Sequence, residues 1–143
     1  MRSREVLDAP EALVLTMVLV AAADGGMTDR EIGVMSGQVQ TLPAFREFTT
    51  ERLIEATNAA VRLLNEDDGL KYAGRLLRGA LSARLRETAY ALACEVVAAD
   101  GAPKPRALDM LEFVRGEIDL DPLIAAAIER GVRARYARTD SVS

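Results

Sequence analysis

Two similar segments of the chain, Val20-Ala-Ala-Ala-Asp-Gly and Val97-Ala-Ala-Asp-Gly, each end at an aspartate followed by a glycine. Each segment closes an apolar run with helical periodicity, and a second amphipathic run follows it, over 30–35 in the first copy and 106–111 in the second. Glycine after an acidic residue ends a helix, so each copy predicts a helix, a tight turn and another helix. The chain is therefore expected to contain two related helix-turn-helix units, a pattern that predicts architecture but no reaction.

The composition agrees with a helical fold. Half of the 143 residues are apolar, only 4% are aromatic, and alanine is abundant, which favours helices packed closely on small aliphatic side chains. No segment shows a convincing strand pattern. We therefore predict an all-α protein of seven or eight helices, forming a single domain over 1–143 with its core at about 9–138.

Local signals mark where the helices begin. Capping residues of the favoured types precede the helical runs, and two of them, Asp8 and Thr28, have a glutamate three positions later, as in a capping box. The other expected caps are Thr49 or Thr50 and Ser82, and Asp121-Pro122 is expected to restart the chain into the terminal helix. The run from Ala12 to Ala23 has only Thr16 as a polar residue and is too short to cross a bilayer, so it predicts a buried central helix.

The helix expected after Ser82 has two different faces. Leu85, Ala89, Leu92, Val96 and Ala99 recur at helical spacing and predict a core-facing stripe. The opposite stripe contains Arg84, Thr88, Ala91 and Glu95 and is expected to be the polar side of the helix.

Several classes of function are disfavoured by what the sequence lacks. The chain has no histidine, which excludes Ser-His-Asp and Cys-His catalysis and makes a zinc site very unfavourable, and its glycines lack the spacing of a phosphate-binding loop. We therefore predict that the protein is not an enzyme. A net charge of −4 argues against nucleic-acid binding. Cys94, the single cysteine, is expected to be a buried apolar side chain in a reducing compartment, so we expect a cytoplasmic protein.

The Asp-Gly turns suggest an ion site. Asp24-Gly25 followed by Glu31 equals the second half of an EF-hand calcium loop, but Val20 and Ala22 occupy the earlier ligand positions, so an EF-hand is rejected. If the two turns pack together, Asp24, Glu31 and Asp100 could share a hard cation, calcium or magnesium, which would relieve their repulsion. The structural alternative is that both aspartates accept turn hydrogen bonds and that Glu31 completes the Thr28 capping box.

Basic residues gather in two other segments. Lys71, Arg75 and Arg78 lie on one face of a predicted helix, Arg84 and Arg86 follow, and the terminal helix carries Arg130, Arg133, Arg135 and Arg138. Such a surface could bind an acidic protein or anionic lipid headgroups, although most such runs are only solvated helix faces. The alternative function is therefore a helical protein-protein adaptor that uses the Lys71–Arg86 surface and has no metal site.

The paired Ala-Asp-Gly turns, the helix start from Thr28 to Glu31, and Ile118-Asp-Leu-Asp-Pro122 before the last helix resemble the tellurite-resistance TerB-like domain. The resemblance covers about 9–138 and corresponds to the stand-alone form of the domain. It implies a compact bundle of two related halves with acidic residues gathered on one surface. The acidic positions of the family motif fall on Asp24, Glu31 and Asp100, while the fourth falls on Ala107, which implies that cation binding is weakened or lost in this chain.

The resemblance also implies a function. It points to a non-enzymatic bacterial stress-response module that binds a divalent cation, partner proteins or both through its acidic face, within a membrane-linked assembly of other proteins. Contact with the inner face of the membrane is then expected to be peripheral at most.

Overall fold

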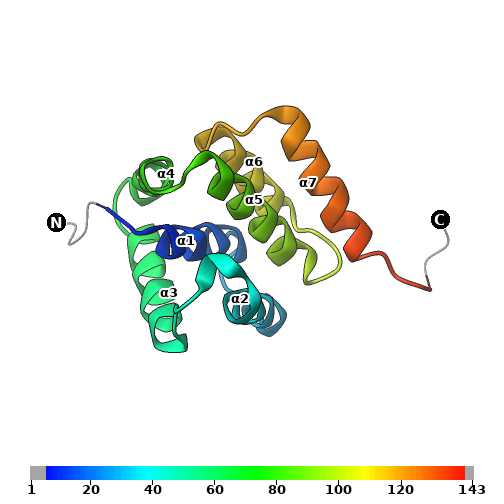
Figure 1. Cartoon of the computed structure of the whole chain (residues 1–143), viewed down its shortest axis with the longest axis horizontal. Coiled ribbons are helices and arrows are strands. Elements are labelled where there is room, and N and C mark those ends of the chain that lie inside the picture. The colour runs from blue at the N-terminus through cyan, green and yellow to red at the C-terminus, as the bar shows by residue number, and fades with distance from the viewer. Residues whose placement is uncertain (1–5, 141–143) are drawn as a thin grey trace.

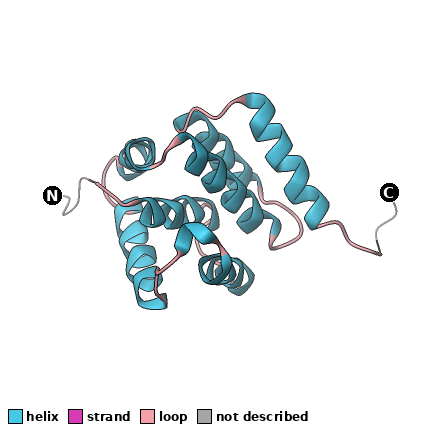
Figure 2. Cartoon of the chain, viewed as in Figure 1, coloured by secondary structure: helices cyan, strands magenta, loops and turns pink. Residues whose placement is uncertain are grey.

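A computed structural model describes residues 6–140, and the outermost parts of the predicted domain, 1–5 and 141–143, lie outside the described residues. Within residues 6–140 the chain forms seven α-helices, one short 3-10 helix and no strand (Figure 2). The predicted all-α fold is confirmed. In chain order, the elements are α1 (Ala9–Ala21), α2 (Asp29–Thr41), the 3-10 helix η1 (Pro43–Phe45), α3 (Thr50–Leu64), α4 (Gly69–Ala80), α5 (Ala83–Ala98), α6 (Pro105–Glu117) and α7 (Pro122–Arg135).

The predicted caps explain most of the helix starts. Side-chain oxygens accept backbone N–H bonds at the N-caps of α1, α2, α3, α5 and α7, which are Asp8, Thr28, Thr49, Ser82 and Asp121. Both predicted capping boxes are present. At the start of α6, Lys104 is the N-cap residue and makes no side-chain capping bond. The Lys104 side chain instead forms an ion pair with Asp24.

Helix α1 is the centre of the molecule. Every residue from Ala12 to Ala21 is buried, and α3, α4, α5 and α6 all pack against the helix (Figure 1). Its one polar side chain in that stretch, Thr16, donates its hydroxyl to the Ala12 carbonyl at 2.8 Å, so burial leaves no unpaired hydroxyl donor. An apolar helix without a polar face is stable here because neighbours surround it, and each fully buried Leu or Val contributes about 1.5–3 kcal/mol.

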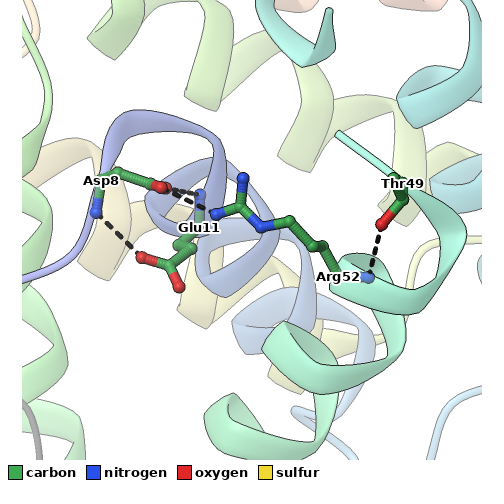
Figure 3. Close-up of polar contacts among 4 residues, drawn as sticks. All are labelled: Asp8, Glu11, Thr49 and Arg52. Atoms are coloured by element: carbon green, nitrogen blue, oxygen red, sulfur yellow. Dashed lines mark hydrogen bonds and ion pairs between the residues drawn. The ribbon is translucent and has the colours of Figure 1, made fainter. Parts of the chain in front are cut away.

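The start of α1 is tied to the start of α3. Asp8 accepts the Glu11 backbone N–H at 2.9 Å, and its second carboxylate oxygen lies 2.8 Å from Nη2 of Arg52 (Figure 3). Arg52 lies in the first turn of α3, which Thr49 caps, and its guanidinium also stands 4.5 Å from the Phe48 ring centroid. Burial alone would raise the pKa of Asp8, but the Glu11 N–H and Arg52 outweigh it and lower that pKa.

The two predicted units pack against each other. Helices α1 and α5, which carry the two repeat segments, form an extensive contact. Each is followed by its Asp-Gly turn, and Gly25 (φ 112°) and Gly101 (φ 85°) both adopt positive φ values that other residues rarely adopt. Packing the equivalent helices together brings the two turns to the same side of the bundle.

Candidate functional site

The two Asp-Gly turns contact each other through side chains that cross from one repeat to the other. Nζ of Lys104 lies 2.7 Å from Oδ2 of Asp24. In the opposite direction, Oγ1 of Thr28 lies 3.1 and 3.2 Å from the two carboxylate oxygens of Asp100. Thr28 stands four positions after Asp24, as Lys104 stands four positions after Asp100. Equivalent positions of the two repeats therefore reach across to the aspartate of the other copy.

Glu31 lies beside this pair of turns and is buried, with 6% of its surface exposed. Its Oε1 accepts the Thr28 backbone N–H at 2.8 Å, while its own N–H donates to Thr28 Oγ1 at 3.1 Å. The capping-box interpretation of Glu31 is confirmed. Its counterpart in the second repeat, Ala107, is also 6% exposed, so the same buried position takes a small apolar residue where α6 has no capping box.

Lys104 is the positive charge of the site. Its hydrogen bond and charge interaction with Asp24 raise its pKa, and the charges of Asp100 and Glu31 act in the same direction. The hydrogen bond from Lys104 in turn lowers the pKa of Asp24. The three carboxylates expected to gather at the turns are therefore close enough to act on one ammonium group, whose side chain remains 49% exposed.

No three or more Asp, Glu, Cys or His side chains converge into a metal-binding group among residues 6–140. Asp24 is engaged by Lys104, Asp100 by the Thr28 hydroxyl, and Glu31 by the Thr28 backbone N–H. Binding of calcium or magnesium by these residues stays a prediction, and it requires rearrangement of at least the Lys104 side chain.

Sequence reasoning missed Lys104. The signal was present, because aligning the two repeats on their aspartates places Lys104 opposite Thr28, a residue already recognised as a cap. A lysine cannot cap a helix N-terminus as threonine does, since its ammonium group only donates hydrogen bonds. Its presence at that position therefore indicates a carboxylate within reach.

The basic segment around α4 is divided between exposed and structural residues. Lys71 and Arg75 are exposed, and Arg75 lies 5.5 Å from the Tyr72 ring centroid. Arg78 pairs with Glu117 at 2.6 Å, which joins α4 to α6. Arg86 donates to the backbone carbonyls of Leu81, Ile118 and Arg78, so it links three segments of the chain. Partner binding by Lys71, Arg75 and Arg78 stays a prediction.

A second polar cluster joins α5 to α7. Glu95, expected on the polar stripe of α5, is only 7% exposed, because α7 covers that side of the helix. Its carboxylate accepts from Nε of Arg135 at 2.7 Å and from the Tyr136 hydroxyl at 2.6 Å. The expectation of a solvent-facing Glu95 was wrong, because helical periodicity shows which residues share a face but not which neighbour covers it.

The interface between α5 and α7 contains a second tyrosine–glutamate hydrogen bond, in which α5 supplies the tyrosine and α7 the glutamate. The Tyr90 hydroxyl of α5 donates to Glu129 of α7 at 2.5 Å, and Nη1 of Arg115 lies 3.4 Å from the same carboxylate oxygen. Burial raises the pKa of Tyr90, and the hydrogen bond to Glu129 raises it further. Cys94 lies one helical turn after Tyr90 on α5, next to Glu95, and it is buried as predicted. Burial raises the pKa of its thiol to about 12.

Across the described residues, no helix combines the length and the hydrophobicity that a membrane span requires. Comparison with curated proteins and with solved structures finds no significant match. Comparison with family models matches residues 10–130 to the family described as "Tellurite resistance protein TerB". That match covers both repeats, the paired turns and most of α7. The TerB-like helical domain is not a known enzyme fold. The chain therefore belongs to the TerB family of tellurite resistance proteins.

Proposed function

We propose that this chain is a non-enzymatic module of a tellurite-resistance type of stress response, and that it binds a divalent cation at the paired Asp-Gly turns in exchange for the Lys104 ammonium group. The observation that carries the proposal is the position of Lys104. Its ammonium group pairs with Asp24, and the charges of Asp100 and Glu31 also raise its pKa. A positive charge supplied by the chain itself indicates that this cluster favours a cation.

Exchange of Lys104 for an external ion is physically reasonable. A half-exposed lysine on the surface holds its partner weakly, because water screens the pair and the long side chain must be ordered. Calcium and magnesium carry twice the charge and bind carboxylate oxygens directly. The absence of an acid at Ala107 leaves three carboxylates at most, so we expect weak affinity and a response only to high cation concentrations.

The melting temperature tests the proposal in wild type, Lys104→Met and Asp24→Asn/Asp100→Asn, each with EDTA, calcium or magnesium. A ligand specific for the native state adds about 2.7 kcal/mol to stability at about 100 times its dissociation constant. We expect a rise with calcium or magnesium in wild type, a larger rise in Lys104→Met because its competitor is gone, and none in the double variant.

Lys71→Met is the matched control, because it removes the same charge from an exposed position on α4, away from the turns. It should respond to cations as wild type does. If Lys104→Met is destabilised in EDTA and neither cation restores it, the turns are structural and the cation proposal is wrong.

The wider role that we propose follows the family. Other proteins of a membrane-linked stress-response assembly would be the partners, and the chain would contact the membrane only peripherally. The exposed Lys71 and Arg75 on α4 support the adaptor alternative, whereas Arg78 and Arg86 are engaged in structural contacts. Arg75→Glu should weaken capture of an acidic partner without altering the cation response, which separates the two functions.

A further inference from the structure

An open groove runs along α5 between α6 and α7, and one end of its lining reaches Gly101 and Pro103 in the second Asp-Gly turn. Its volume is about 520 Å³. Both α6 and α7 pack on α5, and α7 is the outermost helix on this side of the molecule (Figure 1). The backbones of α6 and α7 make few contacts with each other, and an ion pair between Arg115 and Glu129 joins the two helices. The apolar lining comes from all three helices, with Cys94, Val97 and Ala98 on α5, Leu108 and Leu111 on α6, and Val132 on α7.

The two walls of the groove differ in character. On the α6 side, Leu108 is 47% exposed, although it is a large apolar residue. On the α7 side, Arg133 is exposed, and its guanidinium group has no ion-pair or hydrogen-bonding partner among the described residues. Arg138 lies beyond it and pairs with Asp140, while Arg115 lies towards the end where Tyr90 meets Glu129. The lining also includes two acidic residues, Glu129, which pairs with Arg115, and Glu112, which is exposed on α6. The groove thus offers an apolar floor, a basic edge on α7 and an acidic residue on α6.

These features point to a helical occupant. The lining on α5 extends from Tyr90 to Ala98, which corresponds to about 12 Å at 1.5 Å per residue, or roughly two helical turns. Helices form both walls and the floor, so a fourth helix would complete the packing on this side. Peptides that bind in this mode place an apolar stripe in the groove and set charges along its edge.

We propose that this groove binds an amphipathic helix of a partner protein, with carboxylates along the flank that faces α7. The whole chain carries a net charge of −4 and therefore repels an acidic helix in general. The basic edge on α7 would attract the acidic flank of such a helix locally, which favours binding in this groove. Leu108 and Leu111 would receive the apolar stripe, and Arg133 would pair with the nearest carboxylate. The proposal does not depend on cation binding at the paired turns.

The test uses the full chain in EDTA and a fluorescent synthetic helix of about 14 residues, long enough for three to four turns. The probe has leucines on one stripe and glutamates on one flank, and a second probe has lysine at every glutamate. We expect saturable binding of the glutamate probe by fluorescence anisotropy. The lysine probe should bind at least about tenfold more weakly, since reversing the flank replaces attraction at Arg133 by repulsion.

Variants with matched controls locate the binding. Arg133→Glu and Leu108→Glu should each weaken binding of the glutamate probe about tenfold or more. Arg130→Glu makes the same charge change on α7 outside the groove lining, and Leu123→Glu changes an apolar side chain that is 82% exposed and also outside it. Both controls should bind as wild type does, and circular dichroism should show the same helix content in all four variants.

Three results would overturn the proposal. One is absence of probe binding up to millimolar concentration, and another is equal weakening by the groove variants and their controls. The third is concentration-dependent association of the chain alone that Leu108→Glu abolishes, measured by sedimentation. In that case a second copy of this chain covers the groove.

Discussion

At the scale of single residues, the environment decides what each reactive group can do. Cys94 lies in the lining of the open groove, but the residue itself is buried on α5. A thiol reacts as its thiolate, and burial opposes that charged form, with Glu129 adding a smaller unfavourable charge. Direct reduction of an oxyanion by this side chain is therefore disfavoured, which agrees with a module that acts by binding.

We predict that Cys94 reacts slowly with Ellman's reagent in the native protein. With a pKa of about 12, only about one thiol in 10⁴ is ionised at pH 8. The reaction followed at 412 nm should be at least a hundredfold slower than that of a free cysteine and should become fast in guanidinium chloride. A native rate equal to that of the unfolded chain would show that the thiol is neither buried nor shifted.

Some residue roles were readable from the sequence and others were not. Asp8 and Thr28 were predictable as caps because a capping box involves only residues three apart. The burial of Cys94 followed from its apolar neighbours in sequence. The roles of Lys104 and Glu95 depend on partners in distant segments, Asp24 and Tyr136, and only the tertiary arrangement supplies those partners.

At the scale of elements, the start of α1 shows how one side chain can serve two helices. Asp8 caps α1 and pairs with Arg52 at the start of α3, so the two helix starts stabilise each other (Figure 3). Half-exposed ion pairs contribute little by themselves. The backbone capping bond is therefore the larger part of the effect, and the ion pair fixes the carboxylate in the geometry that capping needs.

We predict that Asp8→Ala lowers the free energy of unfolding by about 1 kcal/mol. Asp109→Ala, which removes an exposed carboxylate from the middle of α6, should change stability by less than about 0.5 kcal/mol. Chemical denaturation at pH 7 measures both. The lowered pKa of Asp8 means that its contribution is present above the unfolded-state pKa and is lost as pH falls through the folded-state pKa. The difference between wild type and Asp8→Ala should therefore shrink in acid.

At the scale of the whole molecule, stability is unevenly distributed. Helix α1 packs against five other α-helices, α2 to α6, whereas α7 packs mainly on α5 and lies at the edge of the molecule (Figure 1). The sequence predicted the existence of both helices from their periodicity and caps. It could not predict that α6 and α7 stand apart, because that spacing depends on how each packs on α5. The groove between them was for this reason beyond sequence reasoning.

This arrangement predicts that α7 opens before the rest of the fold. Amide hydrogen exchange read by mass spectrometry should show the slowest exchange in α1 and α5 and faster exchange throughout α7, because few neighbours hold it. Tyr136→Phe removes one of the two Tyr–Glu bonds of the interface and leaves Glu95 with Arg135 alone. It should speed exchange in α7 by a factor of roughly 2 to 10, since such a bond contributes about 0.5–1.5 kcal/mol. Exchange in α1 is the internal control, and equal acceleration in α1 would mean that α7 opens only together with the whole bundle.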